Sequence, residues 1–133
     1  LADIRHTLDR FMPEYQCDSY QLKQKSNIVY IPLNEIMYVE SINTKCILHR
    51  TENREYNIYK KLCQIEAELN DLRFLRCHQS YLVNMNYVIE ANDVCLLQNG
   101  EEVLIRKKSK KQIQQKVLDY REKTGHSDIE IKY

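Results

Sequence analysis

The spacing of apolar positions changes along the chain, and each change predicts a different element. Near the N-terminus, Ile4, Leu8 and Phe11 recur at helical spacing, which predicts an amphipathic helix of about ten residues that ends before Pro13. From residue 20 to residue 41, short runs rich in Ile, Val and Tyr are interrupted by polar residues, as in the strands of a sheet. The pattern therefore predicts a leading helix followed by β-structure.

Turn residues divide the β-region that follows. A short polar connection separates the apolar runs 45–50 and 54–59, which is typical of a hairpin. Further along, Asn99-Gly100 is the strongest short hairpin signal in the chain. Residues 86–106 are therefore expected to form a meander of short strands.

Helical spacing returns in two further stretches. Leu62, Ile65 and Leu69 share one face of a short central helix, which we expect to end at Asn70. A C-terminal helix is expected to begin near Ser109, whose spacing to the glutamine three residues later is that of a capping box. The apolar face of this helix consists of Ile113, Val117 and Tyr120.

Composition narrows the possible functions. A chain of 133 residues has the length of one domain, and its two glycines exclude glycine-rich phosphate loops, so no cofactor is expected. No apolar run approaches the roughly 18 to 20 residues of a membrane helix, so we expect a cytoplasmic protein that does not enter a membrane. Because the chain begins at Leu1, we also expect it to be a fragment that lacks a partner domain.

Five cysteines are spread widely along the chain. They form no Cys-x-x-Cys pair, and no histidine lies at zinc-finger spacing from them. We therefore expect small buried apolar side chains in a reducing compartment, with no bound metal and no disulfide. The positions are Cys17, Cys46, Cys63, Cys77 and Cys95.

Residues 74–84 contain a dense run of polar and reactive side chains between two apolar ends. Because successive side chains of a strand point to opposite faces, Cys77 should lie on the inner face with Leu75, while Arg76 and His78 point outward. Adjacent Cys77 and His78 are then poorly placed to form the nucleophile–base pair of a thiol enzyme. An enzyme is therefore not expected.

A basic run covers residues 105–116 and contains six cations without an acidic residue. Four of them lie on or just before the first turn of the predicted C-terminal helix, where the helix dipole disfavours positive charge. A solvated helix face is one interpretation. Their position favours another, in which the free N–H groups of the helix and the lysines bind phosphates of duplex DNA.

Three polar or basic connections adjoin predicted strands. They lie near residues 43–45, 78–80 and 106–108. The first would be an ordinary turn if it stood alone. Together, the three resemble loops that a rigid β-scaffold presents to a ligand.

Specific motifs resemble the LytTR family of bacterial DNA-binding domains. The first is Ile31-Pro32-Leu33-Asn34-Glu35-Ile36-Met37-Tyr38-Val39-Glu40, and the second is Leu62-x-x-Ile65-x-x-x-Leu69. The most specific is Phe74-x-Arg76-x-His78-x-Ser80-Tyr81-Leu82-Val83-Asn84, and the similarity continues through Asn99-Gly100 to Arg106. The resemblance covers about residues 20 to 118.

The resemblance implies a mainly β fold, with antiparallel strands in several small sheets, a short central helix and a C-terminal helix. It also implies a transcription regulator whose loops enter the DNA major groove at direct repeats in promoters. The regulator would bind this DNA as a dimer. Such domains are usually the output half of a two-component response regulator, whose receiver domain is phosphorylated by a histidine kinase. Residues 1–19 would then be a linker with its amphipathic helix, residues 20–122 the DNA-binding domain and residues 123–133 a tail.

The resemblance also assigns site residues. Lys45, Gln79 and Arg106 would contact bases. The predicted phosphate contacts are Asn43, Thr44, Arg76, His78, Ser80 and Lys107, to which the basic run adds Lys108, Lys110 and Lys111. This chain departs from the family pattern in having Gln79 where Arg is frequent and Ile105 where Ser is frequent.

Two alternatives from other classes remain open at the level of sequence. One is a protein-interaction or dimerisation module, in which the basic helix binds an acidic partner. The other is a redox sensor that uses Cys77, since nearby Arg76 and His78 would lower the pKa of an exposed thiol.

Overall fold

The computed structural model describes residues 18–124 of the chain, which divides into two compact units, Leu1–Ile36 and Met37–Tyr133. The predicted helix at residues 4–11 and most of the predicted tail lie outside the described residues. In the first unit, β1 (Ser19–Lys23) pairs antiparallel with β2 (Ile28–Pro32), and a 3-10 turn, η1 (Leu33–Glu35), follows.

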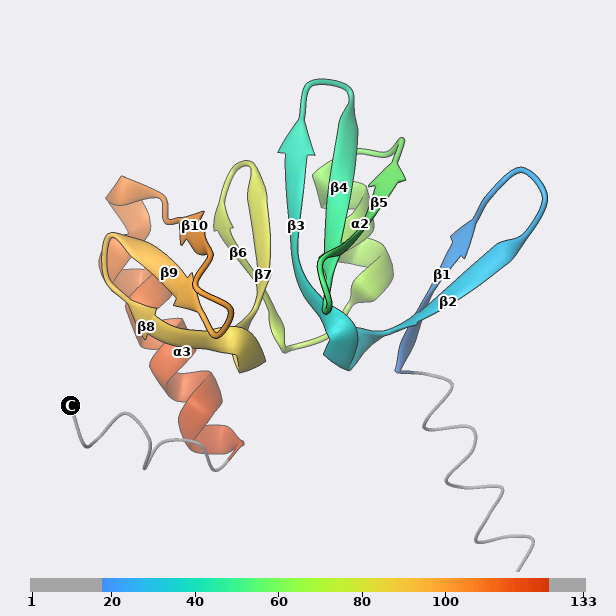
Figure 1. Cartoon of the computed structure of the whole chain (residues 1–133). Helices are drawn as coiled ribbons and strands as arrows, with labels where there is room; N and C mark the ends of the chain where they lie inside the picture. Colours follow the sequence, from blue (N-terminus) through green and yellow to red (C-terminus); the bar gives the residue numbers. More distant parts are fainter. Residues whose placement is uncertain (1–17, 125–133) are drawn as a thin grey trace, which may run out of the picture. The chain divides into compact units, whose positions relative to one another are not determined.

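The second unit contains a five-stranded antiparallel sheet with the strand order β5-β4-β3-β7-β6 (Figure 1). The strands are β3 (Ile36–Ile42), β4 (Lys45–Arg50), β5 (Arg54–Ile58), β6 (Phe74–His78) and β7 (Tyr81–Asn84). The predicted hairpin between residues 45–50 and 54–59 is confirmed, since Arg50 pairs with Arg54 and Cys46 with Ile58. Its turn contains Glu52 and Asn53 at φ 66° and φ 60°.

A three-stranded antiparallel sheet follows, in the order β10-β9-β8. Its strands are β8 (Val88–Ala91), β9 (Val94–Leu97) and β10 (Glu102–Leu104), so the predicted meander is confirmed. Gly100 lies at φ 93°, a conformation that other residues rarely adopt, and its N–H donates to the Leu97 carbonyl at 2.9 Å. This is the turn that Asn99-Gly100 predicted.

Two helices complete the second unit. The central helix α2 (Leu62–Leu69) ends at Asn70, whose left-handed backbone (φ 41°) stops the helix as expected. The C-terminal helix α3 (Lys110–Lys123) follows a 3-10 turn, η3 (Lys107–Ser109). Within residues 18–124, no helix has both the length and the apolar character needed to cross a membrane.

The capping box at Ser109 is wrong in one respect. Ser109 does occupy the N-cap position of α3, but its side chain makes no capping hydrogen bond within residues 18–124. The preceding 3-10 turn gives Ser109 the backbone angles φ −112° and ψ 15°, whereas a capping serine needs an extended backbone. The side chain of Ser109 therefore does not cap the N–H groups at the start of α3, where the lysines also lie.

One core cluster of the second unit contains residues of both sheets and of α3. Leu75 and Cys77 of β6 are buried while Arg76 and His78 are only partly buried, which confirms the predicted alternation. Members of this core are Met37, Tyr38, Leu75, Cys77, Val83, Met85, Val88, Cys95, Leu97, Val103, Ile105, Ile113 and Val117. The fold class, mainly antiparallel β in small sheets with two helices, is confirmed.

Buried Asn84 organises the connection from β7 to the second sheet. Its side-chain oxygen accepts a hydrogen bond from the Asn86 N–H at 2.9 Å and so caps a 3-10 turn, η2 (Met85–Tyr87). The side chain of Asn84 therefore holds this turn in place.

Candidate nucleic-acid interface

Three connections of the second unit lie at the same edge. Strand pairing of β3 with β7 ends where Glu40 faces Tyr81, so the β3–β4 turn and the β6–β7 turn are neighbours. A hydrogen bond from the Ser41 N–H to the Ser80 carbonyl at 2.8 Å joins them. The connection from β10 to α3 joins the same edge, because the Arg106 N–H donates to the Cys77 carbonyl at 2.7 Å. Figure 1 shows the three connections at the upper edge of this unit.

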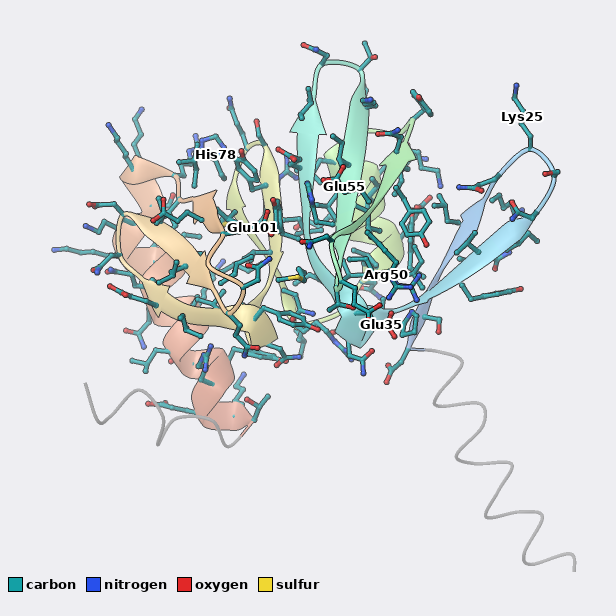
Figure 2. The ribbon with its side chains drawn as sticks, in the orientation of Figure 1. Lys25, Glu35, Arg50, Glu55, His78 and Glu101 are labelled. Atoms are coloured by element: carbon teal, nitrogen blue, oxygen red, sulfur yellow. The ribbon has the colours of Figure 1, made fainter. Side chains whose placement is uncertain are left out.

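A surface hollow of roughly 290 Å³ lies between the second and third connections. It is lined by His78, Gln79, Leu104, Ile105, Arg106 and Lys107. Four predicted site residues, two from each connection, therefore meet at one place. Gln79 and Arg106 are both exposed there, and Figure 2 shows His78 at the end of β6.

The β3–β4 turn carries the remaining predicted base contact. Asn43 and Thr44 form its exposed tip, with Asn43 at φ 55°, a left-handed conformation that asparagine tolerates well. Lys45 is the first residue of β4 and is partly buried. Strand β3 extends two residues beyond its last pairing with β7, and the turn follows.

His78 has a defined hydrogen-bonding role. Its Nδ1 accepts a hydrogen bond from the Ser80 N–H at 3.1 Å, so the proton of the neutral ring lies on Nε2. The ring also packs edge-on against Tyr81, with 5.6 Å between the ring centroids. The side chain therefore keeps one N–H donor for a ligand.

Arg76 is directed back toward its own turn. Its Nε donates to the His78 carbonyl at 3.1 Å, and one terminal nitrogen donates to the Gln79 carbonyl at 2.8 Å. The other terminal nitrogen forms an ion pair with Glu66 Oε1 of α2 at 3.0 Å. The predicted phosphate contact of Arg76 stays a prediction, and this guanidinium already has three protein acceptors.

The lysines at the start of α3 differ in their surroundings. Lys107, Lys108 and Lys111 are exposed. Lys110 donates to Asp93 Oδ1 in the β8–β9 turn at 2.8 Å, and this hydrogen bond lowers the pKa of the Asp93 carboxyl. Lys110 is thus tied to the protein, whereas its three neighbours extend into solvent.

Cys77 does not have the properties of a redox sensor. Its side chain has no exposed surface, and a hydrogen bond with Cys95, together with burial, raises the pKa of its thiol. A sensor thiol needs access and a lowered pKa, so the structure contradicts this alternative. Within the described part of the chain, Cys46, Cys63, Cys77 and Cys95 are free, and Cys17 lies outside it. The absence of metal and disulfides in the protein itself stays a prediction.

The sequence did not identify two partners of the site residues. Glu66 lies ten residues before Arg76 on a different element, and Asp93 lies 17 residues before Lys110 in the turn between β8 and β9. Nothing in the local pattern linked either acid to the basic residues, because both contacts depend on the packing of α2 and α3.

Comparison with known proteins shows that the chain is similar to DNA-binding domains. A family model described as the LytTr DNA-binding domain matches residues 26–118. Accessory gene regulator protein A of Staphylococcus epidermidis is 31% identical over 117 residues, which cover 84% of this chain and 48% of that protein. The protein of the same name from Staphylococcus aureus is 36% identical over 89 residues, covering 65% of this chain and 36% of that protein. The chain thus spans at most about half the length of these relatives.

A solved structure has the same fold. It is described as the LytTr DNA-binding domain of a putative methyl-accepting/DNA response regulator from Bacillus cereus. The TM-score is 0.63 and the identity is 24%, with 76% of this chain and 96% of that chain covered. At this identity, the similarity supports the fold alone.

Proposed function

The chain belongs to the LytTR family of DNA-binding domains, and from this premise we propose that it recognises a specific duplex sequence through its three clustered connections. The family consists of DNA-binding regulators and not of enzymes. The observation that carries the proposal is that Gln79 and Arg106, from separate connections, are exposed on the same hollow.

Base recognition is assigned to Lys45, Gln79 and Arg106. In the major groove, an arginine fork matches the O6 and N7 acceptors of guanine, and a planar carboxamide matches the N6 donor and N7 acceptor of adenine. Because the two side chains adjoin one hollow, they are suited to neighbouring bases of one groove. Lys45 would contact a further base from the β3–β4 turn.

Phosphate recognition is assigned to the rim of the same edge. Lys107, Lys108 and Lys111 are exposed where the N-terminus of α3 adds the positive end of a helix dipole, which attracts anions. His78 has its Nε2 donor, and Lys110 would contribute if it leaves Asp93. Hydroxyl and amide donors complete the set with Asn43, Thr44 and Ser80.

The wider context belongs to the same proposal. The chain would be the output domain of a longer cytoplasmic response regulator, with a receiver domain phosphorylated by a histidine kinase. Two such domains would bind as a dimer to direct repeats in promoters. The similarity to about half of accessory gene regulator protein A supports a role within a longer gene regulator.

Selection of bound oligonucleotides from a random duplex pool tests the proposal. The expected result is one enriched motif, in which Arg106→Ala flattens the preference at one position. Lys107→Gln should weaken binding to all duplexes without changing the motif, because phosphate contacts carry no sequence information. A domain that retards no duplex from the pool would overturn the proposal and favour the protein-interaction alternative.

A further inference from the structure

The β6–β7 turn, which carries Gln79, is held by a side chain of the preceding strand. The register of β6 and β7 shifts between Arg76 and His78, so the backbone there departs from regular strand pairing. Carbonyl groups at such an irregularity need donors from outside the ladder. Arg76 supplies two, to the carbonyls of His78 and Gln79 at 3.1 Å and 2.8 Å.

The carbonyls of His78 and Gln79 belong to the two peptide groups on either side of the Gln79 Cα, so one rigid guanidinium bound to both restrains the backbone of Gln79. This restraint sets the direction in which the Gln79 side chain leaves the backbone. Base recognition depends on this direction, since a bidentate contact tolerates little displacement. The turn is further held by the Ser80 N–H bond to the His78 ring.

Glu66 fixes the guanidinium from the other side. Its carboxylate binds the remaining terminal nitrogen at 3.0 Å, and the two side chains keep 42% and 30% of their surface exposed, for Glu66 and Arg76 respectively. Exposed ion pairs of this kind contribute little to the stability of a fold. The pair is better suited to orienting the arginine than to holding α2 in place.

We propose that Arg76 and Glu66 are positioning residues for base recognition, acting through the backbone of Gln79 rather than through a phosphate. The inference rests on the proposed function, because it assumes that Gln79 reads a base. It changes the role expected of Arg76 and adds an acidic residue of α2 that the sequence did not suggest.

The effect of Glu66→Gln on discrimination between bases separates this inference from simple electrostatics. Removing a negative charge near DNA should strengthen binding to every duplex if charge alone matters. A positioning role instead predicts poorer discrimination at one base position. The loss should be roughly fivefold, as expected when an orienting hydrogen bond is weakened. Preferences at the other positions should remain.

The experiment compares dissociation constants for the selected duplex and for duplexes altered at each position. Glu66→Gln and Arg76→Lys should each reduce discrimination at the single position that also responds to Gln79→Ala. Glu68→Gln is the matched control, because Glu68 lies on the same helix and pairs with Lys60 instead of the turn. It should leave every preference unchanged. Glu66→Gln is a nearly isosteric change of a partly exposed side chain, so the test does not depend on Arg76 variants that fold poorly.

Two results would overturn the inference while the proposed function stands. One is a wild-type motif that Glu66→Gln leaves intact at every position. The other is an Arg76→Met variant that weakens all duplexes alike and reduces the salt slope by about 0.9, as loss of one phosphate contact would. If the wild-type domain selects no motif, both the inference and the proposed function fail.

Discussion

Replacing Lys107, Lys108 and Lys111 together by Gln should remove most of the salt dependence of DNA binding. All three ammonium groups are exposed at the start of α3, next to the hollow that contains Gln79 and Arg106. Lys110 is left in place because it already donates to Asp93 at 2.8 Å. The change therefore removes three cations without breaking an ion pair among the described residues.

The magnitude follows from counterion release. Each neutralised phosphate contributes about 0.9 to the slope of log K against log salt, so three contacts contribute about 2.7. Between about 50 mM and about 200 mM salt, the wild-type domain should lose about 40-fold more affinity than the variant. Binding measured by fluorescence anisotropy over this range, with one selected and one unrelated duplex, gives both slopes. The two duplexes should be affected alike, because phosphate contacts do not read sequence.

Lys123→Gln provides the control. Lys123 is exposed at the opposite end of α3, about 20 Å from Lys110 along the helix, which exceeds the screening length of about 10 Å at 0.1 M salt. Its slope should match that of the wild type. A triple variant with an unchanged slope, or a Lys123→Gln variant with an equal loss, would refute the placement of phosphates at the start of α3.

Three further predictions concern the fold. Asn84→Ala should lower the free energy of unfolding by about 1 to 3 kcal/mol in urea denaturation, because it leaves the Asn86 N–H without its acceptor; an unchanged midpoint would contradict this role. Gly100→Ala should lower the free energy of unfolding by about 1 kcal/mol in the same assay, because alanine is strained at φ 93°. No atom lies within 4 Å of the added methyl group, so no steric clash contributes, and a gain in stability would contradict this prediction. Titration of the denatured protein should find all five cysteines as free thiols, and elemental analysis should find no stoichiometric zinc.

Local chemistry explains why much of the fold was predictable. The alternation of Leu75, Arg76, Cys77 and His78 fixed which side chains enter the core, and the structure confirms each. Asn99-Gly100 likewise predicted its hairpin, because few other residues tolerate the required backbone. Such signals depend on only a few neighbouring residues, so they can be recognised without knowledge of the tertiary structure.

The parts that were missed depend on packing between distant elements. Ser109 was expected to cap α3 through its side chain, but the 3-10 turn before it changes the backbone at that position. The pairing of Glu66 with Arg76 requires α2 to lie against β6, which no local pattern encodes. For the same reason, the sequence did not distinguish Lys110, which binds Asp93, from exposed Lys111.

The most direct test of the account is the base preference of three proteins, the wild type, Gln79→Arg and Gln79→Ala, each selected from the same random duplex pool. The carboxamide of Gln79 matches adenine, and an arginine at this place matches guanine. We predict that Gln79→Arg changes one position of each repeat from adenine to guanine, with a difference in discrimination of about 1 to 3 kcal/mol. Gln79→Ala should flatten the same position and leave the salt slope unchanged. Identical motifs from all three proteins would contradict the claim that this turn reads DNA sequence.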